Sequence, residues 1–112
     1  MCGINGFFSK SLNTYNNIIT AMNMAISHRG PDTNGKWEDK NSGIVLGHQR
    51  LSIIDITSAG NQPMQSFSKR YILTFNGEIY NHLEIRNELK INNSKIIWRG
   101  NSDTKTLIEA ID

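Results

Sequence analysis

The sequence has one cysteine among its 112 residues, no long hydrophobic run and no cluster of basic residues. A single cysteine excludes an intramolecular disulfide and any metal site built from several thiolates. No apolar stretch approaches the ~18 residues that a membrane span needs, and no basic segment precedes an apolar stretch, so we expect no secretory signal. A net charge of +2 is too small to indicate nucleic-acid binding. We therefore expect a cytoplasmic protein that binds neither nucleic acid nor a membrane.

The length and composition predict one globular domain over residues 1–112, since 38% of the residues are hydrophobic and 20% are charged. Local patterns predict an α+β fold, with helices expected to follow the N-caps Asn81 and Ser102. The expected strands are 2–8, 35–39, 43–55, 70–81 and 94–100, the expected helices are 13–27, 82–90 and 103–112, and 57–69 is an expected loop. The last helix reaches Asp112 without a stop signal, so we expect a fragment of a longer chain.

Cys2 lies in the opening motif MCGI, directly after the initiator methionine. One interpretation is a small buried residue at the start of a strand. The other is an N-terminal nucleophile, because removal of Met1 would leave Cys2 with a free α-amine. The pKa of such an amine is ~7.7–8.0, close enough to neutrality for it to act as the general base for its own thiol. That chemistry needs no histidine or aspartate partner.

Two stretches place an arginine in an unusual setting. HRGPD at 28–32 is typical of a helix stop followed by a turn, although its Arg29 could equally lie over a pocket. Arg50 interrupts the apolar run of LGHQRLSIID at 46–55. It either lies on a solvated face or faces a pocket, where its planar guanidinium group would hold a carboxylate through two hydrogen bonds.

The stretch FNGEIYN at 75–81 also has two interpretations. Asn-Gly is the strongest short signal for a β-hairpin. The alternative is an oxyanion hole, in which the Asn76 amide and the Gly77 N–H face a developing negative charge. Glu78 could then neutralise an ammonium group. A thiol nucleophile, an oxyanion hole, a cation for a carboxylate and an acid for an ammonium group together suit hydrolysis of an amino-acid amide such as glutamine.

The ordered motifs MCGI, HRGPD, GHQRLSIID, NQPM, NGEIYN and SDT resemble the glutaminase domain of glutamine-dependent asparagine synthetases. These are class II glutamine amidotransferases of the N-terminal nucleophile hydrolase superfamily. The resemblance covers essentially the whole chain and implies a four-layer αββα sandwich, incomplete here because further strands would follow residue 112. Exposed sheet edges and poor activity of the isolated segment are expected consequences.

The resemblance implies the catalytic roles. Cys2 is the nucleophile, its own amine is the base, and the product is a γ-glutamyl thioester that water hydrolyses to release ammonia. Asn76 and the backbone N–H of Gly77 form the oxyanion hole. Arg29 is implied to shape the surroundings of the nucleophile.

The resemblance also implies how L-glutamine binds. Arg50 holds the α-carboxylate, and Glu78 and Asp103 receive the α-ammonium group. The implied pocket lining consists of Leu51, Ser52, Ile53 and Ile54. One residue departs from the family pattern: Lys105 stands where a glutamate is usual. It denies Ser102 a capping box and puts a positive charge near Asp103, so any weakening of substrate binding is expected there.

The same resemblance sets the expected cofactors and partners. No cofactor or metal is expected within residues 1–112, whereas the absent synthetase domain would use ATP and magnesium to convert aspartate to asparagine. A homodimer is compatible with the resemblance. Two alternatives stay open: the glutaminase domain of another amidotransferase, acting on amino sugars or surface polysaccharides, and a non-catalytic glutamine-binding module.

Overall fold

The computed structural model describes residues 1–11, 15–53 and 55–112, which form two compact units. The first unit contains residues 1–51, 61–63 and 74–76, and the second contains residues 52–60, 64–73 and 77–112. Residues 13 and 14 of the expected first helix lie outside the described residues, as does the expected pocket residue Ile54.

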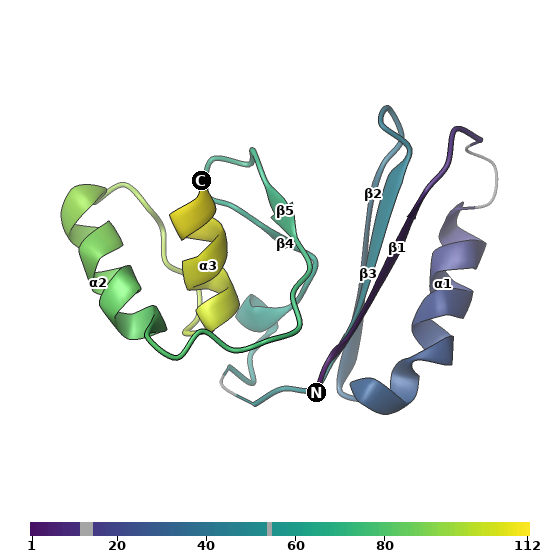
Figure 1. Ribbon diagram of the computed structural model, residues 1–112, viewed down its shortest axis with the longest axis horizontal. Helices are drawn as coiled ribbons and strands as arrows, with labels where there is room; N and C mark the ends of the chain where they lie inside the picture. The colour runs from purple at the N-terminus through teal and green to yellow at the C-terminus, as the bar shows by residue number, and fades with distance from the viewer. Residues whose placement is uncertain (12–14, 54) are drawn as a thin grey trace. The chain divides into compact units, whose positions relative to one another are not determined.

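An antiparallel sheet of three strands forms the centre of the first unit (Figure 1). β3 (Ile44–Arg50) lies between β1 (Gly3–Phe8) and β2 (Thr33–Asp39). These strands confirm the expected strands at 2–8 and 35–39 and the first half of the one at 43–55. The expected strand at 43–55 is wrong for residues 51–53 and 55, which follow the end of β3 at Arg50 and are not part of the sheet.

One helix, α1 (Tyr15–Ala25), packs on one face of this sheet and continues into the 3-10 turn η1 (Ser27–Arg29). The helix confirms the expected element at 13–27 for the residues described. Ile19 on α1 and Val45 on β3 are almost completely buried, and Phe7 on β1 packs against them. This small apolar cluster is the core of the first unit.

Asn23 adds polar contacts between α1 and every strand of the sheet. Its side chain is buried, donates to the carbonyl of Gly35 on β2 at 3.0 Å, and accepts from the amide of Asn5 on β1 at 2.8 Å. Its backbone carbonyl accepts from the side chain of Gln49 on β3 at 2.8 Å. Asn23 therefore connects the helix to all three strands through hydrogen bonds.

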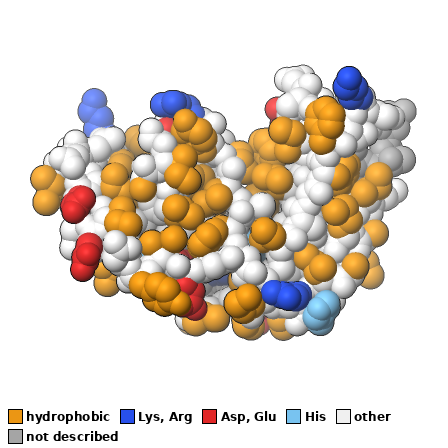
Figure 2. All heavy atoms as spheres, in the orientation of Figure 1, with side chains coloured by type: hydrophobic (Ala, Val, Ile, Leu, Met, Phe, Trp, Pro, Cys, Tyr) orange, Lys and Arg blue, Asp and Glu red, His pale blue; other side chains and the backbone are white. Residues whose placement is uncertain are grey.

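The face of the sheet away from α1 is partly apolar and exposed. The β1–β3 register pairs Ile4 with His48 and Phe8 with Ile44, and all three apolar side chains of these pairs are substantially exposed. Hydrophobic side chains are also widespread on the face of the molecule shown in Figure 2. The described residues therefore leave these apolar side chains exposed.

The second unit contains two helices and a short sheet. Its elements are η2 (Ser58–Gly60), β4 (Met64–Gln65), β5 (Ile72–Leu73), α2 (His82–Asn92) and α3 (Asp103–Ile111). α3 contacts both α2 and β4, with Ile108 almost completely buried (Figure 1). The helices expected at 82–90 and from 103 are confirmed. Ser102 caps α3 through a hydrogen bond from the Lys105 N–H, whereas the side chain of Asn81 makes no capping bond to α2.

Two expected strands in the second unit are wrong or too long. Only Ile72–Leu73 of the strand expected at 70–81 is extended and paired, and neither sheet of the described residues takes a strand from 94–100. Arg86 of α2 holds that segment instead: its guanidinium group lies 4.4 Å from the centre of the Trp98 ring and donates to the Gly100 carbonyl at 3.1 Å. A β-branched, aromatic sequence forms a strand only where a neighbouring strand can pair with it.

The α+β class is thus confirmed, and the four-layer sandwich stays a prediction. Within the described residues, no helix is long and apolar enough to span a membrane.

A substitution at Gly35 tests how closely the loop after η2 packs against β2. A Cβ on Gly35 would lie 1.7 Å from the carbonyl oxygen of Gln62, so Gly35→Ala must displace backbone atoms. We expect a loss of about 1–3 kcal/mol in the free energy of unfolding, measured by urea denaturation. Asn34→Ala, at the exposed neighbouring position, is the control, and equal stability of the two variants would contradict this packing.

Candidate active site

Cys2 lies at the end of the sheet, just before β1. Its side chain is half-buried, and Sγ accepts a hydrogen bond from the Leu51 N–H at 3.3 Å and donates to the Leu51 carbonyl at 3.6 Å. The pairing of Gly3 with Gln49 brings Cys2 beside the residues that follow β3. The thiol is therefore held near backbone amide groups at the end of the central strand.

Arg50 ends β3, and extending the β1–β3 register one residue beyond the Gly3–Gln49 pair puts Arg50 opposite Cys2. Side chains alternate between the faces of a sheet. Val45 and Gln49 face α1, so Arg50 projects from the opposite face. Only 6% of Arg50 is exposed, and its Nη1 donates to Oδ1 of Asn61 at 2.8 Å. The solvated-face interpretation of Arg50 is wrong.

The HRGPD motif packs against the same end of β3. Gly30 is buried, and a Cβ there would lie 2.4 Å from the Gln49 carbonyl oxygen, so only glycine fits this close approach. Arg29 is exposed, and its Cβ lies 3.3 Å from where a Cβ on Gly3 would be. Arg29 is therefore a neighbour of the residue that follows Cys2, as the resemblance implies, and its influence on the thiol stays a prediction.

Asn76 and Gly77 do not form a hairpin. Among the described non-terminal residues, positive φ angles occur at Lys69, Gly43 and Gly100, whereas the common Asn-Gly hairpin turn needs positive φ at both of its residues. The chain runs from β5 through this segment into α2. Asn76 is half-buried and follows Phe75, whose N–H donates to Oε1 of Gln62 at 2.6 Å. The oxyanion-hole role of Asn76 and Gly77 stays a prediction.

In the second unit, Asp103 connects the SDT motif to the NGEIYN motif. It is buried at the start of α3, where Oδ2 accepts from the Ile79 N–H at 2.9 Å and Oδ1 accepts from the Thr104 N–H at 2.8 Å. Ile79 directly follows Glu78, which is exposed. The Asp103 carboxylate therefore binds the backbone of the residue next to Glu78. Of the expected pocket lining, Leu51 and Ser52 are half-buried and Ile53 is exposed.

Lys105 does not stand as a free positive charge beside Asp103. It is buried on α3 and forms an ion pair with Glu109, four residues later. Oε1 of Glu109 also accepts from the Phe67 N–H at 2.8 Å. The Lys105 charge that the sequence suggested would disturb Asp103 is compensated within the helix. As expected without a capping box, the reciprocal bond from position 105 is absent, although Ser102 still caps the helix.

Sequence reasoning missed three buried or bridging polar residues of the first unit: His48, Asn61 and Gln62. His48 projects from the same sheet face as Arg50 and is completely buried. Burial lowers the pKa of His48 below its usual 6.5; the backbone of Phe75 opposes this shift, and the positive charge of Arg50 adds to it. His48 is therefore neutral at physiological pH. Asn61 and Gln62 belong to the NQPM motif, which contributed to the family resemblance but did not indicate a role for either residue.

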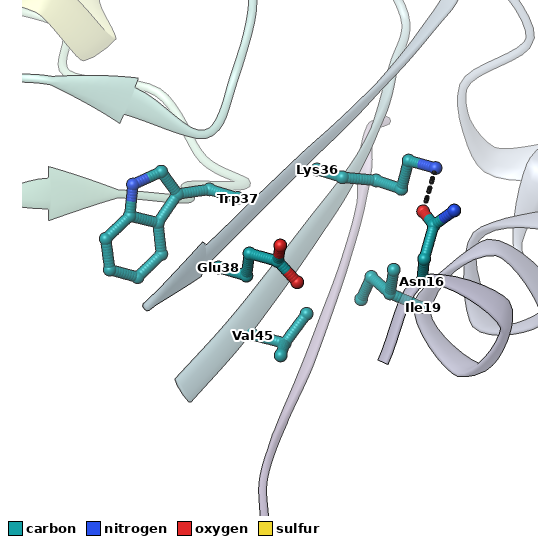
Figure 3. A pocket seen from close by; sticks show the side chains of 6 residues that line it. All are labelled: Asn16, Ile19, Lys36, Trp37, Glu38 and Val45. Carbon is teal, nitrogen blue, oxygen red and sulfur yellow. Dashed lines mark hydrogen bonds between the residues drawn. The ribbon is translucent and has the colours of Figure 1, made fainter. Parts of the chain in front are cut away.

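A separate pocket of about 180 Å³ lies on the α1 side of the sheet, away from Cys2 and Arg50. Its lining residues are Asn16, Ile19, Lys36, Trp37, Glu38 and Val45. Figure 3 shows Lys36 directed at Asn16, to which its Nζ donates at 2.7 Å, while the Trp37 side chain points away from the others. The Lys36 side chain is thus hydrogen-bonded to α1. None of the expected site residues lines this pocket. Among the residues that the structure describes, no group of three or more potential ligands could hold a metal.

These motifs agree with comparisons to known proteins. A family model described as a glutamine amidotransferase domain matches residues 1–112. The chain therefore belongs to the glutamine amidotransferase domain family.

Several similar proteins are glutamine-hydrolyzing asparagine synthetases. The chain is 39% identical over 112 residues to asparagine synthetase 1 of Bacillus subtilis, covering 96% of this chain and 17% of that protein. It is 37% identical over 107 residues to a putative asparagine synthetase of Methanocaldococcus jannaschii, covering 81% and 21%. It is 39% identical over 90 residues to asparagine synthetase B of Escherichia coli, covering 79% and 16%. The resemblance inferred from the motifs is confirmed, and the chain spans about a fifth or less of these relatives.

The buried His48 predicts a pH dependence of stability. Its folded pKa lies below its unfolded value of about 6.5, so below that pH the unfolded chain binds a proton that the folded chain does not. The free energy of unfolding should therefore fall as the pH drops below about 6.5, by up to ~1.4 kcal/mol per pH unit from this group, until the folded pKa is reached.

Urea denaturation between about pH 5 and pH 8 measures this effect. His48→Gln should flatten the acid side of the profile, and His28→Gln, at an exposed histidine, is the matched control. An unchanged acid slope in His48→Gln would mean that His48 is not a source of the pH dependence.

Proposed function

We propose that this chain is the glutaminase part of a glutamine-hydrolysing asparagine synthetase, releasing ammonia from L-glutamine. Its membership of the glutamine amidotransferase family supports the reaction class. The single structural observation that carries the proposal is the position of Cys2, whose thiol bonds to the backbone of Leu51, the residue that follows the buried Arg50. The candidate nucleophile and the cation proposed to bind the carboxylate thus belong to the same unit.

The proposed reaction begins with removal of Met1. The freed α-amine of Cys2 takes the thiol proton, and the thiolate attacks the side-chain carbonyl carbon of glutamine. The Asn76 amide and the Gly77 N–H stabilise the oxygen of the tetrahedral intermediate. The intermediate collapses, ammonia leaves with the proton from the amine, and a γ-glutamyl thioester remains. Water attacks the thioester, which releases glutamate and restores Cys2.

Substrate recognition would use charge at both ends of the amino-acid moiety. Arg50 would hold the α-carboxylate, since a guanidinium group suits bidentate binding of a carboxylate. Glu78 and Asp103 would receive the α-ammonium group. The residues proposed to line the pocket are Leu51, Ser52, Ile53 and Ile54.

The whole protein would couple this ammonia to a second reaction. By analogy with the relatives, a synthetase domain using ATP and magnesium would convert aspartate to asparagine, and the chain studied by itself would be poorly active. We place the protein in the cytoplasm and regard a homodimer as compatible with its function. An amidotransferase acting on another acceptor, such as an amino sugar or a surface polysaccharide, would share the chemistry at Cys2.

Cys2→Ala is the central test of the proposal. In the full-length enzyme it should abolish ammonia release from glutamine, because no other described residue is a cysteine, and it should leave the dissociation constant for glutamine nearly unchanged. Activity is measured as glutamate formation, and binding is measured by calorimetry. Synthesis supported by added ammonia should persist.

The mass of the purified protein supplies the control for this test. A mass that lacks Met1 is required for the free α-amine. If active enzyme retains Met1, the N-terminal nucleophile mechanism fails, and if Cys2→Ala loses binding as well as hydrolysis, Cys2 has a structural role. Retention of Met1 with intact glutamine binding would favour the non-catalytic binding module.

A further inference from the structure

We propose that Asn61 and Gln62 are positioning residues: Asn61 orients the guanidinium group of Arg50, and Gln62 holds the backbone that leads into Asn76. The inference rests on the proposed function, since it concerns how the same glutamine molecule is bound and hydrolysed. Neither residue is expected to touch the substrate.

The loop segment that carries both residues is held firmly against the sheet. The Gln62 carbonyl lies so close to Gly35 that a Cβ on Gly35 would be 1.7 Å from its oxygen. Asn61 is also contacted by β2, since Oγ1 of Thr33 donates to its Oδ1 at 3.5 Å. A rigid support of this kind is needed if side chains are to fix the geometry of other groups.

Asn61 provides a neutral acceptor for a buried cation. Its Oδ1 accepts from Nη1 of Arg50 at 2.8 Å, while only 6% of Arg50 is exposed. The bond restrains the plane of the guanidinium group, and its acceptor is an uncharged amide oxygen. A carboxylate at position 61 would make the same hydrogen bond, but it would also add a negative charge beside Arg50 and compete with the substrate's own carboxylate. Asparagine therefore suits a site that must bind an anion.

Gln62 acts on the other side of the loop. Its side chain is buried, and its Oε1 accepts from the Phe75 N–H at 2.6 Å. Phe75 directly precedes Asn76, so this bond limits the movement of the backbone that carries the Asn76 amide. Nearby, Oγ1 of Thr74 donates to the Gly47 carbonyl on β3 at 3.4 Å. Donors of an oxyanion hole stabilise a transition state only if they are aligned in advance.

The two adjacent side chains thus act on different kinetic quantities. A change at Asn61 should weaken ground-state binding of glutamine, whereas a change at Gln62 should slow the chemical step. A residue that merely stabilised the fold would lower both together with the melting temperature.

The Gln62 arm compares two variants in the full-length enzyme. Gln62→Met keeps the length of the side chain and removes the acceptor of the Phe75 hydrogen bond. Because this bond is proposed to align the oxyanion hole with the transition state, kcat for glutamine hydrolysis should fall at least about 10-fold. KM should stay within about twofold of the wild-type value. Gln62→Glu keeps an oxygen acceptor and should retain most of kcat. Gln65→Met, at an exposed glutamine on β4, is the matched control.

The Asn61 arm measures glutamine binding in the Cys2→Ala background. Asn61→Leu should raise the Kd about 10-fold, and Asn61→Asp should raise it at least as much although it preserves the acceptor. With Cys2 intact, kcat of Asn61→Leu at saturating glutamine should stay within about threefold of the parent. Asn34→Leu, on the exposed part of β2, is the control.

Several outcomes would overturn the inference. Wild-type kcat in Gln62→Met would do so, as would unchanged glutamine affinity in Asn61→Asp, or parallel losses of kcat, affinity and melting temperature in every variant. These results differ from a failure of the proposed function, which would appear as absent ammonia release by the unaltered full-length enzyme.

Discussion

The antiparallel register between β1 and β3 is the constraint on which the first unit depends. Because Gly3 pairs with Gln49, the N-terminus ends beside the last residues of the central strand, and the Cys2 thiol meets the Leu51 backbone. A shift of one residue would turn every side chain of β1 to the other face of the sheet. Arg50 would then no longer lie across from Cys2. The position of the candidate nucleophile is therefore a property of strand pairing and needs no dedicated side-chain partner.

Polar groups stabilise this domain where apolar burial is scarce. The core cluster of the first unit is small, and the face away from α1 carries exposed apolar side chains. Buried groups such as Asn23 and Gln62 compensate through hydrogen bonds to the backbone, and Gly30 and Gly35 allow backbone segments to approach where a Cβ would collide. A segment built in this way is specific in its geometry, because each buried polar atom needs its own partner.

The sequence predicted the elements that local signals define and missed those that depend on distant contacts. Ser102 and the apolar spacing after it were sufficient for α3. The segment 94–100 has the composition of a strand, but Arg86 binds it from α2, and no strand among the described residues pairs with it. Family motifs identified the candidate residues Cys2 and Arg50, although they could not show that Asn61 holds the guanidinium group, since that bond spans a loop. Periodicity and capping describe neighbours along the chain, whereas such bonds follow from the folded path.

Asn23 has a consequence for how α1 can move. One residue of the helix bonds to Asn5 on β1, to Gly35 on β2 and to Gln49 on β3. A helix held only by apolar contacts can slide along a sheet in small steps, with a gradual change in energy. Here any movement of α1 along the strands would break three hydrogen bonds at once. The helix therefore has a single stable position along its axis. Sequence changes elsewhere on the helix can alter its packing without altering where it lies along the strands.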